Sequence, residues 1–213
     1  QAHVAGADFV KLFPCIEGAP AYVKALSAPF NHIKFLAVGG VNADNAATFE
    51  LFAEEMRKHE GLMAVGGPGY GIFETVQDLV DYTELCYLRE DEPEMVEEVF
   101  AQVRQLYVKI WSRFLRDYAD PYCVCRMGDD LGFYGQTLLP HDEIRRWIIP
   151  GYKDIVDLVH ASGRPFILHS CGKIFDIMED LIATGIDAKH SNEDSIAPFH
   201  KWVELYGDRI CNL

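Results

Sequence analysis

The sequence predicts an α/β protein, a parallel (β/α) TIM-type barrel that is incomplete and has about seven strands. Short apolar runs alternate along the chain with longer segments of helical periodicity. The runs are continuously apolar, which is typical of parallel strands covered by helices. A closed barrel takes about 250 residues, and this chain has 213. We therefore expect the barrel to fall short of closure.

Each apolar run predicts one strand, and each periodic segment between two runs predicts one helix. The expected strands are residues 9–13, 33–38, 62–65, 122–127, 166–169, 188–191 and 209–213. The expected helices are residues 19–27, 43–59, 72–87, 93–118, 141–162, 174–184 and 195–206. Three helix starts carry recognisable signals: Asn42 is a capping residue, Pro93 suits a first turn, and Pro140 precedes the helix at 141.

Composition and charge exclude several classes of function. The formal net charge of −14 argues against nucleic acid and anionic membrane surfaces as partners. The sequence has no run of 18 apolar residues and therefore predicts no membrane span. Six cysteines in a chain with an ample core favour a reduced, cytoplasmic protein. The chain starts at Gln1 with neither a signal peptide nor a methionine, and we interpret it as part of something longer.

Polar residues at the ends of the predicted strands are the candidates for chemistry, because a β/α barrel carries its active site there. His169 and Cys171 follow one apolar run, and His190 ends the next. Residues i and i+2 of a strand face the same side, so His169 and Cys171 face the barrel mouth together. The pair fits two ligands of a zinc site. The alternative is a hydrogen-bonded core histidine beside a packed thiol.

Other strand ends offer weaker signals. Asp129 and Asp130 follow the strand at 122–127, where they would orient substrate or act as an acid or base, or else cap the following turn. Tyr134 would form part of an apolar wall for a flat ligand, or else a core aromatic. Cys123 and Cys125 are expected to be packing residues inside their strand.

Lys11 lies within the apolar run at 9–13. Burial lowers the pKa of a lysine and makes it a Schiff-base nucleophile; the alternative is a side chain that extends to solvent. The stretches "GADFVKLFP" and "YVKALSAPFNHIKFLAVGGVNADN" resemble the C-terminal part of the 2-keto-3-deoxy-6-phosphogluconate aldolases over residues 5–48. The resemblance implies that Lys11 forms the imine and that Gly39, Gly40 and Val41 form a phosphate-binding turn.

The rest of the chain resembles a different family. The stretches "GPGYGIFETVQDLVDYTEL", "GDDLGFYGQTLLPHDEIRRWIIPGYKDIVDLVH" and "FILHSCGKIFDIMEDLIATGIDAKHSNED" are similar to the uroporphyrinogen decarboxylase superfamily, in its decarboxylase-like and cobamide-dependent methyltransferase branch. The resemblance implies a barrel fold. It also implies a zinc ion held by a His-x-Cys pair, here His169 and Cys171, and by a distant cysteine as the third ligand. That cysteine would lie beyond Leu213, and the local substitutes are His190 and Asp129 or Asp130.

The leading hypothesis is a zinc- and cobamide-dependent methyltransferase, inactive in a truncated form. It would act on a small molecule, with cobamide as methyl carrier, a corrinoid protein as partner, and Tyr134 and His190 contacting substrate. One alternative is a class I aldolase, a carbon–carbon lyase acting through Lys11. The other is a non-catalytic incomplete barrel. We expect a fusion of an aldolase-like piece, residues 1–48, with a decarboxylase-like piece, residues 49–213, and leave the oligomeric state open.

Overall fold

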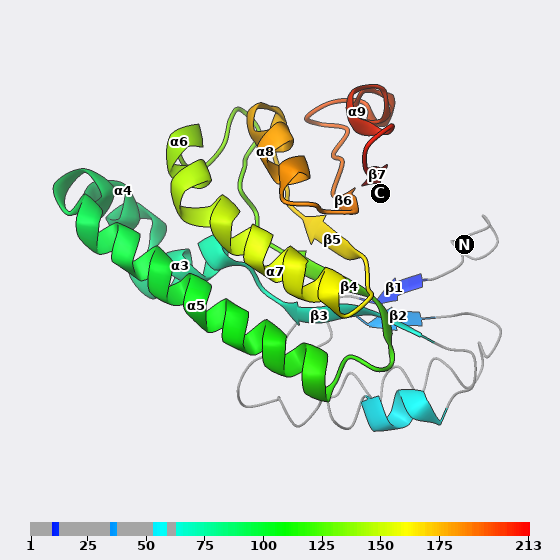
Figure 1. Cartoon of the computed structure of the whole chain (residues 1–213). Helices are drawn as coiled ribbons and strands as arrows, with labels where there is room; N and C mark the ends of the chain where they lie inside the picture. Colours follow the sequence, from blue (N-terminus) through cyan, green and yellow to red (C-terminus); the bar gives the residue numbers. More distant parts are fainter. Residues whose placement is uncertain (1–9, 13–34, 38–52, 59–62) are drawn as a thin grey trace.

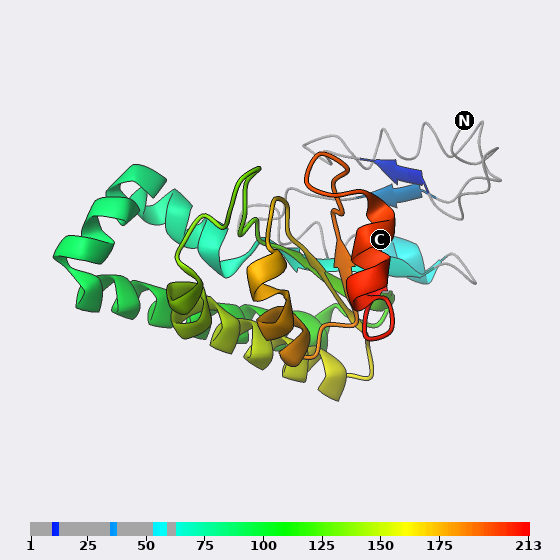
Figure 2. The same ribbon diagram turned by 90° about the horizontal axis from the view of Figure 1, so that it is seen from above.

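The structure of the protein, a computed structural model, describes residues 10–12, 35–37, 53–58 and 63–213. The main part, residues 63–213, is a parallel sheet with helices packed against it (Figure 1; Figure 2). The continuous sheet has five strands in the order β3-β4-β5-β6-β7. They are β3 (Ala64–Gly69), β4 (Tyr122–Gly128), β5 (Phe166–His169), β6 (Ala188–His190) and β7 (Cys211–Asn212). Neighbours in the sheet are successive in the chain, which is the topology of a β/α barrel wall.

Two further strands form a separate sheet. They are β1 (Val10–Leu12) and β2 (Phe35–Ala37), which pair in parallel with Lys11 opposite Leu36. A strand thus forms at each predicted position, but within the described residues the continuous sheet has five strands, fewer than the about seven expected for one barrel sheet. An apolar run predicts that a strand forms, whereas pairing depends on hydrogen bonds between distant segments.

Helices connect the strands of the main sheet. They are α3 (Ile72–Val80), α4 (Tyr82–Asp91), α5 (Pro93–Asp117), α6 (His141–Glu143), η2 (Ile144–Ile148), α7 (Ile149–Ala161), η3 (Phe175–Ile177), α8 (Met178–Ala183) and α9 (Phe199–Tyr206). Residues 53–57 are also helical, inside the predicted helix at 43–59. The predicted helix at 19–27 lies outside the described residues. In the described parts of the chain, none of the helices combines the length and the apolarity needed to cross a membrane.

Two predicted helices are interrupted. The segment at 72–87 divides at Asp81, which has a φ of 68° and accepts a hydrogen bond from the Thr83 backbone N–H. Asp81 therefore ends α3 and caps α4. The segment at 141–162 contains the π-helical turn η2 just before Pro150. Proline has no backbone N–H to continue an α-helical ladder, so it suits the first turn of α7.

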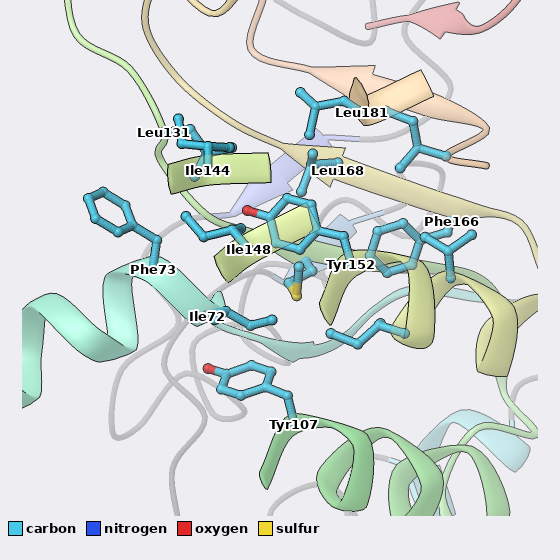
Figure 3. Packing of buried hydrophobic residues seen from close by; sticks show 14 of the residues in the cluster. Ile72, Phe73, Tyr107, Leu131, Ile144, Ile148, Tyr152, Phe166, Leu168 and Leu181 are labelled. Carbon is cyan, nitrogen blue, oxygen red and sulfur yellow. The ribbon is translucent and has the colours of Figure 1, made fainter. Parts of the chain in front are cut away.

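The helices and the sheet share one continuous core (Figure 3). Trp111 on α5, Tyr152 on α7 and Phe166 on β5 are fully buried. The rings of Trp111 and Phe166 meet edge to face with centroids 5.7 Å apart. Because α5 and α7 pack along each other over these strands, they hold the strand ends in place.

Alternation along the strands decides which residues face this core. The core residues of β4 and β5 are Cys125, Met127, Phe166 and Leu168. Successive side chains of a strand point to opposite faces, so Arg126 and His169 point away from the helices. Gly128 lies on the same face. The expectation that Cys125 is a packing residue is confirmed, since it is fully buried in the core.

Candidate metal-binding site

Three polar residues converge at the carboxyl ends of β4 and β5. Asp130 follows β4, His169 ends β5, and Cys171 comes two residues later. The parallel register places Gly128 opposite His169, and His169 opposite His190 at the end of β6. The ends of three strands therefore meet at one edge of the sheet, and that edge carries the polar residues.

The side chains of Asp130, His169 and Cys171 are spaced as metal ligands. One potential ligand atom from each lies within 4.8 Å of the other two. Nε2 of His169 is 3.5 Å from Sγ of Cys171 and 3.6 Å from Oδ1 of Asp130. Ligand bonds to zinc of about 2.0–2.3 Å in tetrahedral geometry place neighbouring donors about 3.4–3.6 Å apart. One imidazole, one thiol and one carboxylate at these separations fit zinc.

His190 contacts the other nitrogen of His169. The two Nδ1 atoms are 2.5 Å apart, and the rings stack with centroids 4.8 Å apart. One of these nitrogens must carry the shared proton. If Nδ1 of His169 carries it, Nε2 of His169 is a lone-pair donor directed at the other two ligand atoms. Contacts of this kind orient metal-binding histidines in known sites.

Cys171 is held by hydrogen bonds from both neighbouring strand ends. Its backbone N–H donates to Oδ1 of Asp130 over 2.8 Å, and its Sγ lies 3.2 Å from Oγ of Ser191. Burial raises the pKa of the Cys171 thiol, and the hydrogen bond with Ser191 opposes that rise. The metal-free thiol is therefore protonated at neutral pH, and metal binding would release its proton.

The turn after Cys171 requires glycine. Gly172 has a φ of +82°, and a Cβ atom there would lie 2.2 Å from the backbone carbon of Gly132. The backbone N–H of Gly172 donates to Oε2 of Glu193 over 2.6 Å. The chain after β5 is thus packed directly against the chain after β4, which keeps Cys171 beside Asp130.

Lys189 supports the site from the helix side of the sheet, and the sequence analysis missed it. The side chain is fully buried, with Nζ 4.4 Å from the centre of the Trp202 ring. Nζ donates to the Ser191 carbonyl over 2.8 Å and to Oδ1 of Asn192 over 3.2 Å. Burial lowers the pKa of Lys189 to about 8. A lysine inside the predicted strand at 188–191 was the available signal.

Asp129 faces away from the three candidate ligand residues. It is fully buried and accepts hydrogen bonds from the backbone N–H groups of Phe73 and Glu74, at 2.9 and 2.8 Å, and from the Tyr152 hydroxyl at 2.7 Å. Burial raises its pKa to about 6. These are the contacts of a cap on α3, at the positive end of the helix dipole. An acid or base role for Asp129 stays a prediction.

Glu74, on the first turn of α3, adds a second perturbed carboxyl. Its side chain is half-buried, and burial together with the Asp129 and Asp130 carboxylates raises its pKa to about 8. The backbone N–H of Asp130 donates to it and opposes the rise. At neutral pH, Glu74 is therefore mostly a neutral acid beside Asp130.

The contacts described above do not include the remaining predicted residues. Tyr134 is 76% exposed, so its proposed part in an apolar wall stays a prediction. Lys11 lies in β1, of which only the backbone is described. The predicted phosphate turn of Gly39, Gly40 and Val41 lies outside the described residues.

Comparison with solved structures supports the fold. A methyltransferase from Methanosarcina mazei matches 99% of this chain with a TM-score of 0.66 and 15% sequence identity. The chain spans 65% of the length of that methyltransferase. A protein from Thermus thermophilus, soaked with ZnCl2, matches 97% of this chain and 91% of its own at a TM-score of 0.45 and 15% identity. No curated protein gives a significant sequence match.

One family model matches most of the sequence. The model of uroporphyrinogen decarboxylase (URO-D) matches residues 32–211. The match begins inside the stretch that resembles an aldolase, and none of the comparisons supports that resemblance. The division into pieces at residue 48 stays a prediction. The site residues on β4, β5 and β6 all fall within the match, and the chain belongs to the uroporphyrinogen decarboxylase family.

Proposed function

We propose that this chain binds one zinc ion through Asp130, His169 and Cys171. We propose further that it is the zinc-binding part of a methyltransferase that transfers a methyl group to a thiol. The observation that carries the proposal is the convergence of an imidazole, a thiol and a carboxylate within 4.8 Å at the strand ends. Three protein ligands leave the fourth position of a tetrahedral site open, as in catalytic rather than structural zinc sites.

Each residue has a distinct part in this proposal. His169 offers Nε2, and its contact with His190 at Nδ1 holds the ring in place. Cys171 gives up its proton to become a thiolate ligand, and the Ser191 hydroxyl lies in position to hydrogen bond to it. Asp130 takes the third place, where the family resemblance implies a distant cysteine. Bound there, zinc supplies Lewis-acid chemistry that favours the thiolate form of a substrate thiol.

The methyl donor belongs to the same proposal. We infer that a cobamide, carried by a corrinoid protein, supplies the methyl group. The structural likeness to a methyltransferase supports a fold suited to this reaction. The aldolase hypothesis has no comparable support, because the matched family model and the similar methyltransferase structure both point to another family.

Metal content tests the proposal directly. We expect about one zinc per chain in the loaded wild-type protein and much less in Cys171→Ser, His169→Gln and Asp130→Asn. Cys211→Ser is the matched control, since Cys211 is exposed on β7. Equal zinc contents in all five proteins would overturn the proposal and favour a non-catalytic barrel. Methylation of a thiol by methylcobalamin in the presence of the zinc-loaded protein then tests the reaction.

A further inference from the structure

Arg126 lies on the same face of the sheet as the candidate metal site. Its neighbours Cys125 and Met127 point into the helix-covered core, so Arg126 points to the opposite face. Two residues further on, Gly128 shares that face and pairs with His169. Along the strand, Arg126 therefore lies two residues, or about 6.6 Å, before Gly128, the residue that pairs with His169.

Arg126 differs from the other arginines of the described residues in having no partner. Nine arginines have a hydrogen bond or ion pair: Arg57, Arg89, Arg104, Arg113, Arg116, Arg145, Arg146, Arg164 and Arg209. Arg126, which is half-buried, has neither within the part of the chain that the structure describes. A guanidinium carries five donors and is charged at every physiological pH, so leaving it unpaired and partly buried is unfavourable.

The surroundings of Arg126 link it to the metal site. Burial lowers its pKa, and Asp130, Cys171 and Glu74 partly oppose that shift in their ionised forms. These are two of the proposed ligands and the carboxyl beside them. Gly128 has no side chain, and a Cβ atom added there would lie 3.6 Å from Cδ2 of His169, which is an ordinary van der Waals distance. The strand therefore puts no side chain between Arg126 and His169.

We propose that Arg126 binds the anionic group of the substrate, a thiol that also carries a carboxylate. This inference rests on the proposed function, because the substrate sulfur would occupy the open position at Asp130, His169 and Cys171. A planar guanidinium binds a carboxylate through two parallel hydrogen bonds. Arg126 would thereby select anionic thiols in a chain whose formal net charge of −14 otherwise repels them.

The alternative is that Arg126 only balances the acidic residues of the site. In that case, removing its charge would change metal affinity but would not change the preference between thiols. An anionic thiol and a neutral thiol of similar size separate the two roles. We choose 3-mercaptopropionate and 3-mercapto-1-propanol, in both of which three carbon atoms separate the sulfur from an oxygen.

The test uses the whole chain loaded with cobalt(II) in place of zinc, because a thiolate bound to cobalt gives a charge-transfer absorption band. We expect wild-type protein to bind 3-mercaptopropionate about tenfold more tightly than the alcohol. Arg126→Gln should lose most of that preference while its affinity for the alcohol changes less than about twofold. Arg126→Lys should retain part of the preference, since it keeps the charge but loses the fork of donors. Arg113→Gln, on the exposed surface of α5, is the matched control.

Four outcomes would overturn the inference. If wild-type protein binds both thiols equally, or if Arg126→Gln keeps the full preference, Arg126 does not bind substrate, and the proposed function stands. If Arg126→Gln changes only cobalt affinity, the residue balances charge. If neither thiol changes the cobalt spectrum of wild-type protein, the proposed function fails together with the inference. Circular dichroism spectra and Tm values of the variants establish that each one is folded.

Discussion

His169 and His190 end neighbouring strands, and their Nδ1 atoms are 2.5 Å apart. The contact leaves Nε2 of His169 facing Cys171 and Asp130. Because contacts of this kind fix the tautomer and orientation of a metal ligand, His190 would matter to the metal without being one of its three ligands. The sequence offered His190 both as a substrate contact and as a substitute metal ligand, and both roles stay predictions.

Replacing His190 should therefore weaken metal binding. In His190→Phe the ring is retained but the nitrogen facing His169 is lost, and we expect zinc affinity to fall by about 10–100-fold. Competition with a chromophoric chelator measures the affinity. His200→Phe, at an exposed position on α9, is the control. Similar affinities for the two variants would show that His190 does not support the ligand.

Gly172 should be far less tolerant of substitution than another glycine with similar backbone geometry. Gly163 has a φ of +77° and no atom near the position of an added Cβ, whereas Cβ at Gly172 would overlap the backbone of Gly132. We expect Gly163→Ala to cost about 1 kcal/mol from backbone strain alone, and Gly172→Ala to cost at least about 3 kcal/mol. Urea unfolding of both variants measures the difference. Equal losses would mean that the two loops do not pack as described.

Lys189 should stabilise the turn that carries Ser191. Lys189→Met removes the donor to the Ser191 carbonyl and to Oδ1 of Asn192, and we expect the free energy of unfolding to drop by about 1–3 kcal/mol. The loss is partly offset because an ammonium group is no longer buried. Lys201→Met, at an exposed position on α9, should change the free energy by less than about 0.5 kcal/mol. A stable Lys189→Met variant would argue against this role.

The raised pKa of Glu74 predicts that the metal-free protein loses stability as the pH rises from mildly acidic to neutral. Its pKa rises from 4.5 to about 8 on folding, mainly through burial. A group whose pKa is higher in the folded state contributes stability that is complete below the unfolded pKa and is lost as pH rises through the folded pKa. Between about pH 4.5 and pH 8, Glu74 should therefore lower the free energy of unfolding by about 1.4 kcal/mol per pH unit.

The variant Glu74→Gln tests that dependence because glutamine does not titrate. Relative to wild type, its free energy of unfolding should increase steadily from pH 5 to about pH 8. Glu84→Gln, on the exposed face of α4, should follow wild type throughout. Parallel curves for wild type and Glu74→Gln would contradict the raised pKa. The measurements use chelator-treated protein, since a bound metal would change the charge beside Glu74.

Much of the main sheet could be predicted from the sequence. The runs at 122–127 and 166–169 give β4 and β5 within one residue, because short, mostly apolar runs of four to eight residues between turn signals favour buried strands. The break at Asp81 was missed, since an aspartate with positive φ has no distinct signature within an amphipathic pattern. The pairing of β1 with β2 follows the expected order, but among the described residues neither of them pairs with β3 of the main sheet.

The sequence by itself predicted that His169 and Cys171 lie together, because residues two apart on an extended strand point the same way. Sγ of Cys171 does lie 3.5 Å from Nε2 of His169, although β5 already ends at His169. The sequence also offered Asp129 or Asp130 as a further ligand. Only the tertiary structure decided which aspartate joins the site. The packing of α3 and α7 takes Asp129 into the core, where it caps a helix, and the register of β4 against β5 brings Asp130 to His169. Both contacts join segments far apart in the chain, which local sequence patterns do not encode.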